Sequence, residues 1–202
     1  MLVLCSNGLS SENLLQALGG KPNARKTAAL VVTADHVYKE SNYHVARCKK
    51  ELESLGLSVE PFDIDTQPVQ LLHNYDVVEF IGGNPFYLLN SIKEHHAVGV
   101  LKELATHKVL IGWSAAAFVF GPSLELVNEY SPEMNILGLT DLKGLSLTDL
   151  EVLPHYSAFL NRFERFEERC QEYEEAHGRQ VVRLNDGDGV IISGNDFYLC
   201  RG

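Results

Sequence analysis

Runs of apolar residues alternate with amphipathic stretches along the first two thirds of the chain. Continuous apolar runs predict buried strands, because a strand covered on both faces lacks polar alternation; they lie at residues 2–5, 27–33, 58–64, 76–81 and 108–111. Helices are predicted between them, at residues 10–18, 43–55, 66–72, 86–92 and 98–104. This alternation predicts an α/β fold with a mostly parallel sheet between helices, and functional groups beyond the carboxyl ends of the strands.

The last third is less regular. It predicts a short strand at Leu150–Leu153, a charged helix from about Asn161 to Ala176, and a terminal β meander over residues 181–184, 190–193 and 195–200. We expect this tail to close an edge of the sheet. The length of 202 residues fits one domain, residues 1–202.

Composition narrows the possible partners. The formal charge of −10, from 17 basic and 27 acidic residues, repels phosphate backbones, so nucleic acid is not expected. No basic flank precedes a long apolar run and no span of about 20 apolar residues occurs, which predicts a cytoplasmic protein without membrane contact.

No metal or other cofactor is expected. The four cysteines are scattered and lack close spacing, which predicts free buried thiols; they are Cys5, Cys48, Cys170 and Cys200. The adjacent His95 and His96 diverge on a helix and do not share a face.

Two turns at predicted strand ends carry candidate chemistry. Ser114 follows a strand through Gly112 and Trp113 and precedes a run of alanines, which is the strand, turn and helix context of a nucleophile elbow. The Ala115 amide, with Gly82 or Gly83 from the other turn, predicts an oxyanion hole. A buried small residue at a strand end is the alternative interpretation of Ser114.

A serine nucleophile needs a base and a group that orients the base. His155 follows Pro154 at the end of a predicted strand and would share a face with Ser114, although it could equally be an ordinary loop histidine. Spacing alone does not separate Glu129 from Glu125 and Glu133 as the acid.

Four segments together resemble the dipeptidase E and cyanophycinase family of serine peptidases. Gly82-Gly-Asn-Pro-Phe-Tyr-Leu-Leu89 resembles its G-G-N-T-F-x-L-L segment, and Ile111-Gly-Trp-Ser-Ala-Ala-Ala117 its I-G-W-S-A-G-A turn. Leu153-Pro-His-Tyr156 is similar to its histidine segment, and Asn128-Glu129 falls where the family carries its acidic partner. The order agrees over nearly the whole chain.

The resemblance implies a class I glutamine-amidotransferase-like, flavodoxin-like three-layer fold. It implies Ser114 as nucleophile, His155 as general base and acid, Glu129 as the group orienting His155, and hydrolysis of short peptides through an acyl-enzyme. The predicted substrate contacts are Asn84 and the arginines of the following helix, Arg162, Arg165 and Arg169. A monomer or homodimer is expected.

Ala116 replaces a glycine of the family's nucleophile turn, and Pro85 replaces a threonine. These departures keep a second hypothesis open, a binding or regulatory module of the same fold that has lost turnover. An esterase with the same order of serine, acid and histidine is a third hypothesis.

Overall fold

The computed structural model describes residues 1–19, 26–194 and 196–202. A seven-stranded sheet runs through the centre in the order β3-β2-β4-β5-β1-β8-β9. Its strands are β1 (Leu2–Cys5), β2 (Thr27–Val31), β3 (Ser58–Phe62), β4 (Val77–Phe80), β5 (Val109–Trp113), β8 (Gly189–Ser193) and β9 (Asp196–Cys200). The first five are parallel, whereas β8 is antiparallel to both β1 and β9.

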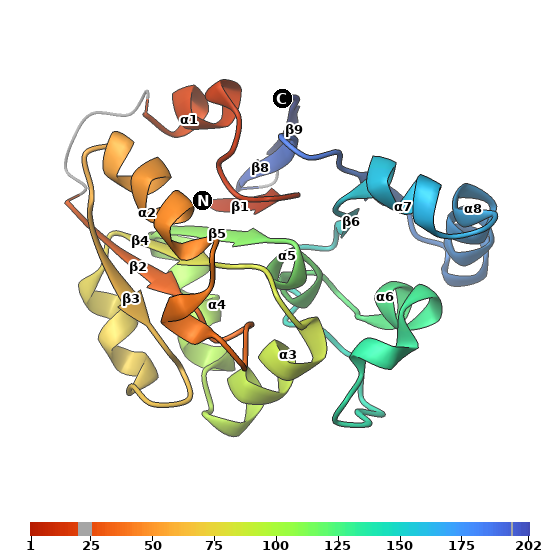
Figure 1. Cartoon of the computed structure of the whole chain (residues 1–202), viewed down its shortest axis with the longest axis horizontal. Helices are drawn as coiled ribbons and strands as arrows, with labels where there is room; N and C mark the ends of the chain where they lie inside the picture. The colour runs from red at the N-terminus through yellow and green to blue at the C-terminus, as the bar shows by residue number, and fades with distance from the viewer. Residues whose placement is uncertain (20–25, 195) are drawn as a thin grey trace.

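Helices cover both faces of this sheet (Figure 1). One face carries α1 (Glu12–Gly19) and α2 (Val45–Ser54); the other carries α3 (Pro85–Glu94), α4 (Val98–His107) and α5 (Ala115–Phe120). Each face has its own apolar core, because side chains of successive strand residues point to opposite sides.

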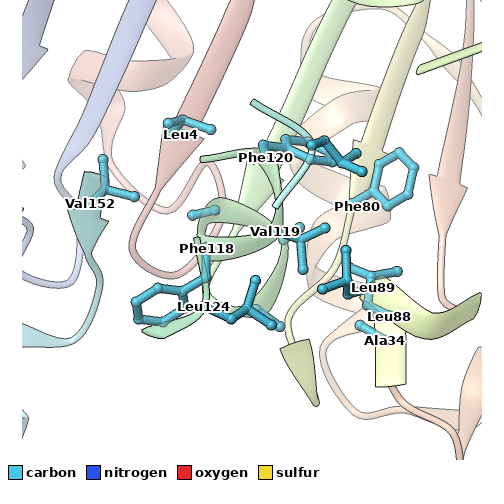
Figure 2. Packing of buried hydrophobic residues seen from close by; sticks show 14 of the residues in the cluster. Leu4, Ala34, Phe80, Leu88, Leu89, Phe118, Val119, Phe120, Leu124 and Val152 are labelled. Carbon is cyan, nitrogen blue, oxygen red and sulfur yellow. The ribbon is translucent and has the colours of Figure 1, made fainter. Parts of the chain in front are cut away.

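On the α3–α5 face, side chains of α5 lie in one cluster with Leu4, Phe80 and Leu89 (Figure 2). The Phe120 ring meets the edge of Phe80 on β4 with a centroid separation of 5.1 Å. All six residues of α5 are buried, although a surface helix normally keeps a polar stripe. The helix that follows Ser114 is therefore fixed inside the core.

A second region lies beside the main sheet. It contains a two-stranded parallel sheet, β6 (Glu151–Leu153) and β7 (Val181–Arg183), with α6 (Glu125–Tyr130), α7 (Tyr156–Arg162) and α8 (Phe166–His177) (Figure 1). Short 3-10 turns complete the chain at η1 (Lys39–Ser41), η2 (Val69–Asn74) and η3 (Pro132–Met134). Tyr130 packs against the rings of Phe159, Phe163 and Phe166.

The predicted three-layer α/β class is confirmed, and two local predictions are wrong. Residues 181–183 do not join a terminal meander, because β7 pairs with β6, whereas β8 and β9 alone close the edge. The single charged helix is two helices, since Arg165 adopts a left-handed backbone with φ of 51° between α7 and α8. The predicted start of the last strand at Asn195 lies outside the described residues.

No helix within the described ranges combines the length and apolarity that a membrane span requires.

Candidate active site

Ser114 occupies a strained turn between β5 and α5. Its φ of 52° and ψ of −111° are unusual for a residue with a side chain. The backbone is fixed from both directions, since the Ser114 N–H donates to the Cys5 carbonyl at 3.2 Å and the Ser114 carbonyl accepts from Ala117 N–H at 3.1 Å. This arrangement turns the hydroxyl out of the sheet.

The substituted alanine fits the turn without displacing it. Ala116 is fully buried on α5 within the apolar core. Gly112 provides the close approach of strand and helix, because a Cβ there would lie 2.6 Å from the Phe120 ring and 3.2 Å from the Ala116 carbonyl carbon. The Ala116 departure therefore leaves the nucleophile turn intact.

His155 lies against Ser114. Its Nε2 is 3.0 Å from Ser114 Oγ, which is hydrogen-bonding distance. His155 precedes α7 and has a left-handed backbone with φ of 58°. Its main-chain N–H donates to Ser6 Oγ at 2.8 Å. The loop after β6 is thereby tied to the end of β1, and the imidazole reaches the serine from the second region.

The carboxylate beside His155 is Asp186, which corrects the sequence prediction. Asp186 Oδ1 lies 2.7 Å from His155 Nδ1 and accepts a second hydrogen bond from Ser6 Oγ at 2.7 Å. Glu129 is exposed on α6, where its main-chain carbonyl accepts from Arg169. The strand topology explains the difference, because β8 runs antiparallel to β1 and so starts at the edge where β1 and β5 end.

Gly83 and Ala115 line the cavity in front of Ser114, whereas Gly82 packs behind it. Gly83 has φ of 153°, and a Cβ there would collide with the Ala34 carbonyl, so only glycine fits. Ala115 is the first residue of α5, where the backbone N–H has no acceptor within the helix. Gly83 and Ala115 are thus the two of the three predicted oxyanion-hole residues that line the cavity. Gly82 instead allows the Trp113 ring to approach, since a Cβ would lie 2.5 Å from it.

A cavity of about 110 Å³ opens beside the serine. Phe118, Val127 and Phe159 give it apolar walls, and Arg162 and Glu133 add the charged groups. Pockets that hold whole small-molecule ligands usually measure about 300–1,000 Å³. This cavity therefore has the size of a subsite for one side chain.

The three predicted arginines separate in space. Arg162 ends α7 and lines the cavity, with its guanidinium 5.0 Å from the centre of the Phe163 ring. Arg165 pairs with Glu168 and Glu172 on the exposed side of α8. Arg169 donates to the Glu129 carbonyl at 2.8 Å. Only Arg162 among the three lines this cavity.

Asn84 caps a helix in the structure, and its substrate contact stays a prediction. Its side-chain oxygen caps α3 by accepting from Phe86 N–H and Tyr87 N–H, both at 3.0 Å. Its side-chain nitrogen donates to the Met134 carbonyl at 2.7 Å. Both ends of the amide are thus engaged within the protein.

Sequence reasoning missed Asp186 and Ser6. Asp186 lies in the Asn185-Asp-Gly-Asp-Gly189 segment, which predicts a turn, and a turn carries no signal of what it faces. Ser6 directly follows the first strand, at the edge where the functional groups gather. For Ser6, its position at this edge was a usable signal. For Asp186, the same signal also required the antiparallel direction of β8.

A second histidine lies near the site. The His44 ring meets the Trp113 indole edge-on with centroids 5.2 Å apart. Burial is the main cause that lowers the pKa of His44, and the charges of Arg47 and His155 act in the same direction. His44 therefore favours its neutral form.

Two known peptidases are similar to this chain in sequence. An uncharacterized peptidase of Listeria monocytogenes EGD-e is 32% identical over 87% of this chain and 86% of its own length. Peptidase E of Escherichia coli strain 536 is 26% identical over 90% of this chain and 80% of its own.

Solved structures show the same fold. The crystal structure of a putative Peptidase E protein from Listeria monocytogenes superposes with a TM-score of 0.78 at 28% identity, covering 100% of this chain and 98% of that one. A peptidase from an acI-B1 Actinobacterium has a TM-score of 0.72 at 17% identity, covering 100% and 87%, which supports the fold alone. The model of Peptidase family S51 matches residues 2–200. The chain therefore belongs to peptidase family S51 and is a serine-type peptidase of the dipeptidase E kind.

Proposed function

We propose that Ser114, His155 and Asp186 act as a catalytic triad that hydrolyses short peptides through an acyl-enzyme. The observation that carries this proposal is the continuous contact from Ser114 Oγ to His155 Nε2, 3.0 Å, and from His155 Nδ1 to Asp186 Oδ1, 2.7 Å. Such contacts allow the base to take the serine proton while the carboxylate fixes its tautomer.

The proposed residues account for each step of acylation and deacylation. His155 accepts the Ser114 hydroxyl proton as Oγ bonds to the peptide carbonyl carbon, and the Gly83 and Ala115 amides stabilise the oxyanion. His155 then gives the proton to the departing amine as the C–N bond breaks. Water, deprotonated by His155, attacks the acyl-enzyme and releases the acid and the free serine.

We further propose that the cavity binds the substrate side chain on the acyl side of the cleaved bond. Arg162, which lines this cavity, would bind an acidic group on that side chain. Arg162 is exposed, and among the described residues its guanidinium has no carboxylate within ion-pair distance. A guanidinium binds a carboxylate through two parallel hydrogen bonds. This supports a preference for aspartyl peptides over neutral ones.

Purified protein and the Ser114→Ala variant are incubated with a dipeptide and tripeptide library that includes Asp-X and β-Asp-Arg members, and the surviving peptides are identified by mass spectrometry. Loss of an aspartyl subset with the parent protein alone is expected. Ser54→Ala, at an exposed position on α2, serves as the matched control and should behave like the parent. Equal consumption by parent and Ser114→Ala, or none by either, contradicts the proposal.

A further inference from the structure

Glu79 is a carboxyl group in the middle of a fully buried strand. It lies between Val77 and Ile81 on the face of β4 that α2 covers, and its exposed fraction is 0%. In the parallel register it stands between Leu30 of β2 and Ile111 of β5. An ionised carboxylate at such a position is costly unless a cation or several donors compensate it.

The surroundings do not supply that compensation. Glu51 of α2 already takes the nearby cation, since its Oε1 lies 2.6 Å from Arg47 Nη1. Both Glu79 oxygens lack a hydrogen-bond partner of ordinary geometry among the described residues. Burial is the largest cause that raises the pKa of Glu79, to about 8, followed by the Glu51 charge; Arg47, Trp113 and Cys48 act in the opposite direction. Glu79 is therefore a neutral acid at pH 7.

Trp113 connects this acid to the nucleophile. Its indole N–H is buried and, like both Glu79 oxygens, lacks a hydrogen-bond partner among the described residues. Trp113 lies on the same face of β5 as Ile111, the register partner of Glu79, so the two unpartnered groups belong to neighbouring strands in one core. The other edge of the ring fills the space left by Gly82, and the next residue in the chain is Ser114. The tryptophan thus lies between the buried acid and the nucleophile turn.

We propose that Glu79 is a positioning residue, whose neutral carboxyl group accepts the Trp113 N–H and so holds the tryptophan that supports the Gly82 turn and Ser114. The inference rests on the proposed role of Ser114. Loss of the Glu79 proton leaves a buried charge without full compensation beside the indole, which disfavours the packed arrangement of the two side chains.

The other titratable groups around Glu79 are few. Cys48, Glu51 and Arg47 face it from α2, and Cys5 faces it from β1. Burial raises the pKa of both thiols, so they stay protonated near pH 8. His44 approaches the far side of Trp113 and titrates on the acid side of its ordinary value. A transition near pH 8 at Trp113 is therefore specific for Glu79.

The same groups could be considered as metal ligands, because single ligand atoms of Cys48, Glu51 and Glu79 lie within 4.8 Å of one another. The Arg47 guanidinium, bonded directly to Glu51, opposes a second cation at this position. We therefore favour the protonated acid, and a metal is an outcome that the experiment distinguishes.

The chain contains one tryptophan, so its fluorescence reports on Trp113 alone. We expect an emission transition near pH 8 in the parent protein that Glu79→Gln abolishes. Glu51→Gln should move the midpoint down by about one pH unit or more, because it removes a like charge and frees Arg47. A transition that survives in Glu79→Gln overturns the proposal, as does an emission change on adding Zn²⁺ that EDTA reverses and Cys48→Ser prevents.

Peptide hydrolysis gives the second readout. Between pH 7 and pH 9 the parent kcat should fall about ten-fold, as expected for a group of pKa about 8, whereas Glu79→Gln, which keeps a neutral acceptor, should hold its rate. Glu79→Leu should lose activity at every pH, and wild-type activity in that variant overturns the proposal. The fluorescence arm needs no turnover, so an inactive parent protein would contradict the proposed function and leave the Glu79 test intact.

Discussion

The two regions that meet at the active site are held together in different ways. The nucleophile region, at the ends of β4 and β5, is fixed by backbone hydrogen bonds and a buried core, with Ser114 bonded through its main chain to Cys5 and Ala117. The region around His155 and Asp186 has backbone hydrogen bonds as well, such as that from the Tyr156 N–H to the Leu184 carbonyl. The His155 and Asp186 side chains, however, are positioned by contacts with each other and with Ser6, and the Asp186 side chain is 53% exposed. Geometry built from the backbone tolerates changes of side chain, whereas geometry built from side chains depends on each one. Truncating the Ser114 side chain should therefore leave the local geometry in place, whereas truncating His155 or Asp186 should disturb it.

Removing the nucleophile has the largest expected effect. Ser114→Ala should lower kcat by on the order of 10⁴-fold or more, because the other triad members have no hydroxyl to activate. The melting temperature should stay within about 2 °C, since the backbone bonds of Ser114 remain. Peptide cleavage and calorimetry on the same sample check both. A large drop in melting temperature would show that this region also depends on its side chain.

The second test separates Asp186 from Glu129. Asp186→Asn should reduce kcat by about 10²–10⁴-fold, because an amide can stabilise the wrong imidazole tautomer and cannot balance its charge. Glu129→Gln is the matched control and should change kcat less than about two-fold, since within the described part of the chain its exposed side chain makes no hydrogen bond or ion pair. The reverse ranking would restore Glu129 as the orienting acid.

The sequence predicts the residues of the first region but not the carboxylate of the second. The nucleophile turn and the glycine turn follow buried strands directly, so local patterns predicted Ser114, Gly83 and Ala115 at one edge. Asp186 depends on the direction of β8, which is set by pairing with β1 across most of the chain length. Side-chain periodicity gives burial and does not give strand direction. The arginines were undecided for a related reason, because the break at Arg165 reorients α8 relative to α7.

The third test asks whether Arg162 reads the substrate. Arg162→Gln should lower kcat/KM for Asp-X peptides by about 10–100-fold, the usual worth of a charge-assisted pair, and should spare peptides with neutral first residues. Arg165→Gln removes the same charge from the exposed side of α8 and should leave both rates unchanged. Equal losses on acidic and neutral peptides would assign Arg162 a general role in holding the cavity wall.

The smallest expected effect on activity is that of Glu79→Gln, and this test therefore measures stability. Folded Glu79 keeps its proton up to about pH 8, whereas an unfolded glutamate releases it near 4.5, so the parent protein should lose stability as pH rises between these values. Glu79→Gln removes this loss and should raise the melting temperature at pH 8.5 by on the order of 10 °C, and by much less at pH 5. Glu53→Gln, exposed on α2, is the control for lost surface charge. A melting temperature that is equally changed at both pH values would contradict the buried-acid explanation.

The Ser6 hydroxyl joins residues that the ribosome makes at very different times. It accepts from the His155 N–H and donates to Asp186, 180 positions further along the chain. The turn at Ser114 can form before Asp186 is synthesised. The proposed contact chain from Ser114 through His155 to Asp186 cannot, because β8 must first pair with β1. Contacts of such long sequence separation form slowly. Newly made chains therefore stay inactive through most of their synthesis, and in refolding experiments peptide cleavage should recover after Trp113 fluorescence does.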